Sequence, residues 1–139
     1  MAVYMVIRHT SHARYDLWYH FAWGTKYRKH IFTDTYTRNR TKILFKTIAA
    51  EHDVTIGEIE VMPDHIHLLA SAPPRIAPAD IARVLKSLST KLLFEEFPWL
   101  KHHYWGGEIW TRGYFVRGIG DQLTKLQITR YIREQSVEQ

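Results

Sequence analysis

Short stretches of alternating apolar and polar residues occur along the chain, separated by longer stretches in which apolar residues recur at helical spacing. The aromatic and apolar stretch 15–25 contains a glycine near its end, Gly24, and predicts a first strand. A basic loop follows, and Thr33 and Asp34 provide an N-cap for a helix that extends to about residue 52. The expected apolar stripe of this helix is Tyr36, Ile43, Leu44 and Ile48.

The next segment has the pattern of a β-hairpin. Residues 54–62 alternate well enough to form a strand, Pro63 and Asp64 are typical turn residues, and residues 65–71 form the returning strand. After a proline-rich break, a second helix is expected from about residue 78 to residue 95. Its apolar positions at helical spacing are Ile81, Val84, Leu85, Leu88 and Leu92.

The last part of the chain predicts a long loop over 97–107, a strand over 108–118 with a break at Gly113 as an option, and a final helix capped by Asp121. The first six elements then follow the split βαβ order of a ferredoxin-like (RRM-like) α+β fold. We therefore expect one domain, residues 1–139, in which two helices cover one face of an antiparallel βαββαβ sheet. The other face is left for a ligand, a partner or the final helix.

The composition narrows the class of protein. The chain has 139 residues and no cysteine, which excludes disulfides and thiolate metal sites. Its 19 Lys and Arg against 14 Asp and Glu give a net charge of +5, which favours polyanions, nucleic acid above all, as partners. Because the chain has neither an apolar run of bilayer length nor a secretory leader, we expect a soluble cytoplasmic protein that does not associate with membranes.

Two histidines stand out in the returning strand of the hairpin. Alternate residues of a strand point to the same face, so His65 and His67 project together while Ile66 and Leu68 point to the core. Two imidazoles at this spacing are able to share a divalent ion, although a pair of structural or surface histidines explains the same pattern. The neighbouring Asp64 either orients an imidazole or serves only as a turn residue.

The final helix carries an unusual polar stripe. Gln127, Tyr131 and Gln135 are spaced by four residues and share one side of the helix, which we expect to face inward between apolar neighbours. A glutamine amide has a carbonyl oxygen that can ligate a hard cation. The opposite side is expected to face solvent and consists of Lys125, Thr129 and Arg133.

Four motifs in the same order resemble one known family. The stretch MPDHIHLLAS (62–71) looks like the His-hydrophobic-His signature of HUH endonucleases. The whole chain is similar to the small single-tyrosine, IS200-like transposases of bacterial and archaeal insertion sequences. The other motifs that carry this resemblance are YHFAWGTKYRKHIF (19–32), YWGGEIWTRGYFV (104–116) and QITRYIREQ (127–135).

The resemblance implies a chemistry and a set of roles. His65, His67 and Gln135 would hold a Mg²⁺ or Mn²⁺ ion, Tyr131 would be the nucleophile, and Asp64 and Gln127 would orient the groups around the ion. It also implies a DNA transposase that cleaves and rejoins single-stranded DNA through a 5′-phosphotyrosine, without ATP. The expected partners are DNA hairpins at the element ends and a second copy of the chain, in a homodimer with composite sites. The protein would associate with the nucleoid when bound to DNA.

Further residues are candidates for binding the strand or for moving the final helix. Cations beside aromatic rings suit single-stranded DNA, because bases stack on the rings while the cations meet phosphates. The DNA-binding candidates are Lys26, Tyr27, Arg28, Lys29, Trp105 and Arg112, and the last two belong to a basic and aromatic region that also includes Trp110 and Tyr114. Gly118 and Gly120 are a candidate hinge for the final helix. The histidines interpreted as structural or surface residues are His20, His30, His52, His102 and His103.

Three other functions fit parts of the pattern. Another HUH nicking endonuclease, replication-initiator or relaxase-like, would share the histidines and the tyrosine, but such proteins carry further domains that this short chain lacks. A non-catalytic module for single-stranded nucleic acid would use the sheet but has no need of the histidine pair and the Tyr-Gln stripe. A metal-dependent hydrolase of small molecules would need more carboxylates near the histidines.

Overall fold

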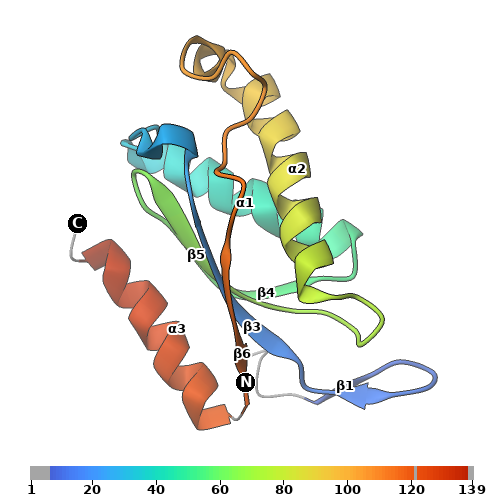
Figure 1. Ribbon diagram of the computed structural model, residues 1–139. Coiled ribbons are helices and arrows are strands. Elements are labelled where there is room, and N and C mark those ends of the chain that lie inside the picture. Colours follow the sequence, from blue (N-terminus) through green and yellow to red (C-terminus); the bar gives the residue numbers. More distant parts are fainter. Residues whose placement is uncertain (1–6, 121, 138–139) are drawn as a thin grey trace.

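The chain is built around a four-stranded antiparallel sheet with the strand order β4-β5-β3-β6 (Figure 1). The computed structural model describes residues 7–120 and 122–137. With one helix between β3 and β4 and another between β5 and β6, this is the predicted ferredoxin-like arrangement. The four strands are β3 (Trp18–Gly24), β4 (Thr55–Val61), β5 (His65–Ser71) and β6 (Phe115–Ile119).

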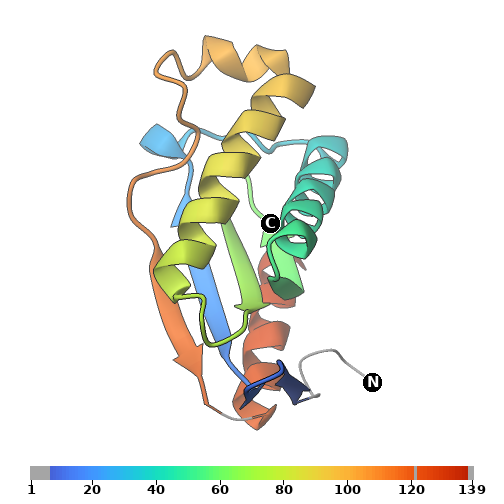
Figure 2. The ribbon, with the colours of Figure 1, turned by 90° about the vertical axis from the view of Figure 1, so that its right-hand side faces the viewer.

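The helices lie on both faces of the sheet. As predicted, α1 (Thr35–Glu51) and α2 (Pro78–Glu96) cover one face, and α3 (Gln122–Val137) lies against the other (Figures 1 and 2). Each face therefore has its own core. Under α1 and α2 the larger core includes Phe21, Trp23, Ile66 and Leu68. Under α3 the smaller core consists of Trp18, Leu69, Ile119 and Ile132.

The cap of α1 is confirmed, and its apolar stripe is confirmed in part, because Ile48 is buried and Leu44 packs against the core. The Asp34 carboxylate accepts a hydrogen bond from the Thr37 backbone N–H at 2.6 Å. Tyr36 is 66% exposed and Ile43 is 49% exposed, whereas two threonines are buried. The threonines are tolerated because the Thr41 hydroxyl donates to the Thr37 carbonyl oxygen, 2.7 Å away. The buried residues of α1 are Thr37, Thr41, Phe45, Ile48 and Ala49.

The second helix follows its prediction closely. Ile81 and Leu85 are fully buried, and three other predicted positions pack partly buried against the same core: Val84, Leu88 and Leu92. Pro78 occupies the first turn, where its missing N–H costs no helical hydrogen bond. No helix within residues 7–120 and 122–137 is long and apolar enough to cross a bilayer.

Two other segments differ from prediction. Regular pairing of the last strand begins only at Phe115, because the chain before Gly113 bends over the core and makes a single bridge between Trp110 and Thr25. Trp110 is consequently a core residue, and its indole N–H donates to the Ser89 hydroxyl at 2.9 Å. A short hairpin of β1 (Arg8–His9) and β2 (Arg14–Tyr15) precedes the sheet and had not been predicted.

Candidate active site

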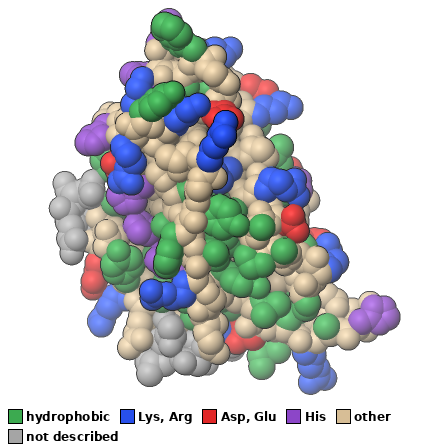
Figure 3. Space-filling model, in the orientation of Figure 1, with side chains coloured by type: hydrophobic (Ala, Val, Ile, Leu, Met, Phe, Trp, Pro, Cys, Tyr) green, Lys and Arg blue, Asp and Glu red, His purple; other side chains and the backbone are tan. Residues whose placement is uncertain are grey.

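The two histidines of β5 lie on the face of the sheet that carries α3. Their ring centroids are 5.0 Å apart with planes at 80°, which confirms that the alternation of the strand brings them together. Ala22 and Gly24 are their partners across the ladder on β3. Neither partner has a large side chain, and the Arg28 side chain lies over Gly24. Histidine side chains gather beside lysine and arginine side chains on this part of the surface (Figure 3).

The Nδ1 atom of each imidazole already has a partner. Nδ1 of His65 lies 2.7 Å from Oδ1 of Asp64, and Nδ1 of His67 lies 3.2 Å from Nε2 of His20. A carboxylate only accepts, so Nδ1 of His65 carries a proton, and in the neutral form of this imidazole the lone pair is on Nε2. Asp64 therefore contacts His65 in the orienting position that the sequence analysis considered, in addition to closing the turn.

Arg28 and the loop around it hold Asp64 in place. The Arg28 guanidinium donates to Oδ2 of Asp64 at 3.0 Å, and the Thr25 backbone N–H donates to the Asp64 carbonyl oxygen at 2.8 Å. Tyr27 and Arg28 both have positive φ, 62° and 51°, which few non-glycine residues adopt. The buried Thr25 hydroxyl donates to the Lys29 carbonyl oxygen at 2.8 Å and so closes this turn. Arg28 thus supports the histidine side of the site. Its side chain is 61% exposed, and its contact with DNA stays a prediction.

The neighbours of Asp64 favour the ionised form of its carboxyl group. Partial burial would raise its pKa, but the hydrogen bonds from His65 and Arg28, together with their positive charge, lower the pKa below the ordinary value of an aspartate. Asp64 therefore remains an acceptor for His65 across the physiological range of pH.

His20 had been interpreted as a structural or surface residue, and the structure corrects this. It is 6% exposed and lies at the site, with its ring centroid 5.5 Å from that of His67. The sequence did contain a signal. In the strand 15–25, Phe21 and Trp23 alternate on the core face, which places His20 on the same face as the two ligand candidates.

The environment of His67 keeps its imidazole neutral. Burial, followed by the charges of His65 and His20, lowers the pKa of His67 from 6.5 to about 4. Between these values the unfolded chain binds a proton that the folded chain does not bind, so the folded state is destabilised as the pH falls. A neutral imidazole near neutral pH is the form that binds a metal ion.

We therefore expect the free energy of unfolding of the metal-free protein to decrease as the pH is lowered from 6.5 toward 4. Denaturant unfolding in the presence of a chelator, at several pH values, measures this slope. His67→Gln, which removes the titrating group, should flatten the slope over the same range. A slope equal to that of the parent would contradict the assignment to His67.

Tyr131 of α3 completes this cluster within the same chain. Its ring meets the His67 ring edge-on, with centroids 5.7 Å apart at 88°, and the His20 ring at 6.1 Å. The tyrosine is nevertheless 45% exposed, so one side of the ring remains open to a substrate. The site therefore combines two neighbouring imidazoles with a phenol that is accessible from solvent.

The orientation of α3 differs from the predicted one. Lys125 and Thr129, expected to face solvent, are each 2% exposed, and Ile132 is fully buried. Lys125 is buried because its ammonium group pairs with the Asp16 carboxylate, 2.6 Å away. Arg133 is exposed as expected, and its guanidinium pairs with the Glu58 carboxylate at 2.7 Å. These contacts rotate the helix about its axis.

The two glutamines of the predicted stripe occupy different environments. Gln127 is exposed and Gln135 is partly buried, one turn before and one turn after Tyr131. Within residues 7–120 and 122–137 there is no cluster of three His, Cys, Asp or Glu side chains fit to hold a metal ion. The two Nε2 atoms fit a divalent ion as nitrogen ligands, and an amide oxygen such as that of Gln135 is the type of donor that would extend the set.

Comparison with known proteins identifies the family. A family model described as "Transposase IS200 like" matches residues 13–135. The chain belongs to the IS200-like transposase family. The ISDra2 transposase TnpA of Deinococcus radiodurans is 37% identical over 121 residues, covering 87% of this chain and 85% of that protein. The transposase for the insertion sequence element IS200 of Salmonella typhimurium is 35% identical over 128 residues, covering 92% of this chain and 82% of that protein.

Solved structures support the same fold. A candidate transposase from Deinococcus radiodurans R1 superimposes with a TM-score of 0.74 at 34% identity, covering 93% of this chain and 98% of that one. A REP-associated tyrosine transposase bound to a REP hairpin superimposes with a TM-score of 0.64 at 16% identity, covering 94% of this chain and 74% of that one. Both have the arrangement of sheet and helices described above.

In this transposase the predicted basic loop and the loop after α2 lie together. Lys29 donates to the His103 carbonyl oxygen at 2.8 Å, and Lys26 pairs with Glu108 at 3.2 Å. Tyr27 is 74% exposed and Trp105 is 92% exposed. We call this the basic-aromatic surface, and it consists of Lys26, Tyr27, Lys29, Lys101 and Trp105. Basic, histidine and apolar side chains are seen together at the corresponding end of the molecule (Figure 3).

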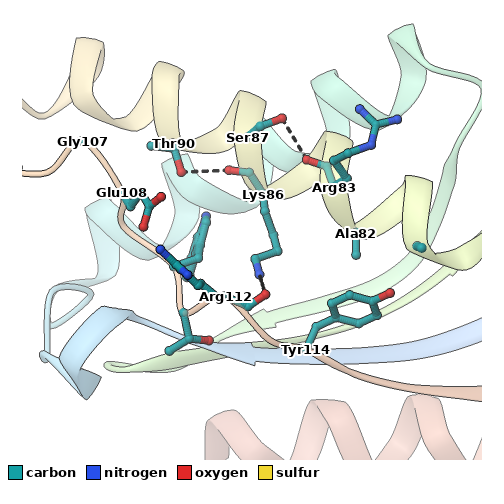
Figure 4. Close-up of a pocket in the computed structure, with 12 residues that line it drawn as sticks. Ala82, Arg83, Lys86, Ser87, Thr90, Gly107, Glu108, Arg112 and Tyr114 are labelled. Carbon is teal, nitrogen blue, oxygen red and sulfur yellow. Dashed lines mark hydrogen bonds between the residues drawn. The ribbon is translucent and has the colours of Figure 1, made fainter.

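Arg112 lies apart from that surface, at a cleft between α2 and the segment that leads to β6 (Figure 4). The cleft has a volume of about 460 Å³ and is also lined by Arg83, Lys86 and Tyr114. The Lys86 ammonium group reaches across it and donates to the carbonyl oxygen of Arg112 at 3.0 Å. Burial lowers the pKa of Lys86.

The two glycines of the candidate hinge occupy ordinary backbone. Gly118 is a paired residue of β6 opposite Tyr19, rather than part of a free linker, and Gly120 follows the end of that strand. A Cβ atom added at either glycine would meet nothing within 4 Å, and neither has a positive φ. Asp121, the expected cap of the last helix, lies outside the described residues. A hinge at Gly120 stays a prediction.

Proposed function

We propose that this transposase cleaves and rejoins single-stranded DNA at the ends of an insertion element, with Tyr131 as the nucleophile. The observation that carries the proposal is the packing of the accessible Tyr131 ring against His67, at 5.7 Å between centroids. A phenol beside two imidazoles is an arrangement suited to phosphoryl transfer, and membership of the transposase family supports DNA as the substrate that we propose.

A Mg²⁺ or Mn²⁺ ion would be held by His65, His67 and Gln135. When bound, it would supply Lewis-acid polarisation of the scissile phosphate. The chain itself prepares the site, because Asp64 and His20 occupy the Nδ1 atoms and leave the Nε2 atoms available. We keep Gln127 as a group that helps to orient the substrate, since it is exposed on the turn of α3 that precedes Tyr131.

The reaction that we propose conserves the number of phosphoester bonds. The phenolic oxygen of Tyr131 forms a bond to the phosphorus, and the bond from phosphorus to the 3′ oxygen breaks. The phenolic proton is released and the departing strand leaves as a free 3′-OH. Because the 5′-phosphotyrosine retains the ester, a 3′-OH of another strand can attack it and rejoin the DNA without ATP.

Hairpin DNA is the substrate that we propose for the basic-aromatic surface. One structural relative is bound to a REP hairpin, and the net charge of +5 suits a polyanion. Tyr27 and Trp105 offer faces on which unpaired bases can stack, and Lys26 and Lys29 lie beside the Tyr27 ring. We propose that the protein works in the cytoplasm, on the nucleoid when bound to DNA.

Trp105→Ala is expected to weaken the binding of a hairpin with a single-stranded flank by about tenfold or more, because one stacked base contributes about 1–3 kcal/mol. Since Trp105 is 92% exposed, its removal should not change the fold. Fluorescence anisotropy measures the affinity. Tyr36→Ala removes another exposed aromatic, on α1 and away from this surface, and should bind as the parent does.

The salt dependence of the same titration separates stacking from charge. Lys26→Ala should reduce the slope of log affinity against log salt by about 0.7, the value for one phosphate of a single strand. Trp105→Ala should leave that slope unchanged. Equal affinities for Trp105→Ala and the parent would remove Trp105 from the proposed DNA surface.

We also propose that the transposase acts as a homodimer in which α3 is exchanged between two copies, as the family resemblance implies. Only Gly120 and Asp121 separate the end of β6 from the start of α3. A helix joined by so short a link can make the same contacts with its own sheet or with that of a second copy, which is the usual route of a domain swap. The cluster around His67 would then be the same in both arrangements.

The enzymatic proposal is tested by incubating the protein with Mg²⁺ or Mn²⁺ and labelled single-stranded DNA from the element ends. A protein-linked product and a rejoined strand are expected. Nicking at one site without rejoining would favour a replication-initiator or relaxase-like enzyme. Hairpin binding without any adduct, with or without metal, would favour a non-catalytic binding module.

A further inference from the structure

His20 has a direct hydrogen-bond contact to one of the two histidines that are proposed to hold the ion. It comes from β3, and its Nε2 atom lies 3.2 Å from Nδ1 of His67, which comes from β5. The two rings are close to parallel, at 24°, with centroids 5.5 Å apart. His20 therefore lies at Nδ1 of His67. In a histidine that binds a metal ion through Nε2, this second ring nitrogen usually has a hydrogen-bond partner.

The orientation of His20 is itself fixed by packing. Phe115 meets its ring edge-on at 5.6 Å and 75°, and Tyr131 does so at 6.1 Å and 72°. His20 is 6% exposed, so its ring lies between the sheet and these two aromatic residues. The same residue thus touches both the candidate nucleophile and a candidate ligand, which links the geometry of the two.

A neutral imidazole has two tautomers, and the hydrogen bond at one nitrogen selects which of them is present. Asp64 makes this selection for His65, because a carboxylate only accepts. A neutral His20 with an unprotonated Nε2 atom would select the tautomer of His67 in the same way, because it would accept a hydrogen bond from the Nδ1–H group of His67. His67 would then keep the Nε2 lone pair that a ligand requires, without a second carboxylate that would cancel the charge of a bound cation.

We propose that His20 is a positioning residue, which holds His67 in the Nδ1–H tautomer and in the ring orientation that presents Nε2. The tautomer part of this proposal concerns the metal-free chain. The metal part rests on the proposed function. If His20 only filled space in the core, its nitrogen atoms would have no role. A phenyl ring at this position would then leave the tautomer of His67 and the affinity for the metal ion unchanged.

Three substitutions separate these roles. His20→Phe keeps a ring of similar size but has no acceptor. His20→Gln can place its amide oxygen close to the position of Nε2, whereas His20→Asn is one bond shorter and reaches only the position of Nδ1. If His20→Phe does not fold, His20→Asn supplies the variant without an acceptor. Thermal unfolding of each variant reports whether the fold is intact.

Long-range ¹H–¹⁵N correlation spectra of the metal-free protein, with labelled histidines, read the tautomer directly. We expect His67 to be Nδ1–H in the parent and in His20→Gln, and to gain the Nε2–H form in His20→Phe and His20→Asn. A parent His67 in the Nε2–H form would overturn the proposal, as would an unchanged His67 tautomer in every folded variant without an acceptor.

Binding of Mn²⁺, followed by the loss of the free-ion signal in electron paramagnetic resonance, provides the second measurement. His20→Phe should bind Mn²⁺ about 10–100-fold more weakly than the parent, as is typical when the partner of a ligand histidine is lost. His20→Gln should recover most of the affinity, and Tyr114→Phe, which alters a tyrosine beside Lys86, should bind as the parent does. Affinities of His20→Phe and parent within twofold of each other would overturn the metal part. If the parent binds no Mn²⁺, the proposed metal site is refuted, and with it the proposal that His20 supports metal binding. The tautomer measurement on the metal-free chain would still decide whether His20 sets the tautomer of His67.

Discussion

Tyr131→Phe is expected to abolish the covalent protein–DNA product, with a loss on the order of 10⁴-fold or more in cleavage. The substitution removes only the hydroxyl group, so the edge-on contacts of the ring with His67 and His20 remain. Hairpin affinity and thermal stability should therefore stay at the parental level. Denaturing electrophoresis of labelled DNA after incubation with Mn²⁺ measures the adduct.

Tyr114→Phe provides a matched control for that result. Tyr114 is 39% exposed and lies at the cleft beside Lys86, on the segment before β6. Loss of its hydroxyl group should leave cleavage unchanged. An adduct that persists in Tyr131→Phe would show that a different side chain is the nucleophile, and mapping of the linked peptide would identify it.

The features that depend on strand alternation were predictable from the sequence. A strand has a period of two whatever surrounds it, so the shared face of His65 and His67 did not require knowledge of the fold. The order of the elements from β3 to α3 was equally predictable, because turn residues and periodicity mark most of these boundaries locally, whereas the β1–β2 hairpin was not predicted. The contact between Asp64 and His65 also follows from their adjacency in the chain.

Features that depend on partners distant in sequence were not predictable in this way. The orientation of α3 was predicted on the assumption that lysine faces solvent, but Lys125 is buried against Asp16, 109 residues away. His20 meets His67 across 47 residues. In α1, threonines satisfied by their own helix took the place of apolar residues. In each case a polar side chain became compatible with burial through a hydrogen bond or an ion pair.

The rotation of α3 also changes how the polar stripe is understood. The prediction required Gln127, Tyr131 and Gln135 to point into the protein, whereas Gln127 is exposed and Tyr131 is 45% exposed. The stripe therefore borders the site and stays open to solvent, which is the position from which a phenol can reach a phosphate of a bound strand. Burial of Lys125, Thr129 and Ile132 on another side of the helix provides the anchorage.

A mixture of two inactive variants is expected to recover cleavage if α3 is exchanged between copies. Tyr131→Phe supplies an intact histidine pair, and His67→Ala supplies an intact tyrosine. In a mixed dimer with exchanged helices, one site combines the functional tyrosine of one chain with the functional histidines of the other. Random assortment of equal amounts then gives about a quarter of the parental number of sites.

The contacts of α3 also allow the opposite outcome, in which the mixture of variants recovers no cleavage because each helix stays with its own chain. Lys125 with Asp16 and Arg133 with Glu58 join the helix to a sheet, and in the single chain that sheet is its own. If the helix stays there, each chain of the mixed dimer keeps its own defect and no cleavage returns. The measurement is made after the two variants have been unfolded together and refolded, so that slow subunit exchange does not mask recovery. Co-refolded Tyr131→Phe alone, and His67→Ala alone, set the baseline. Cleavage at that baseline in the mixture would place the working tyrosine beside the histidines of its own chain.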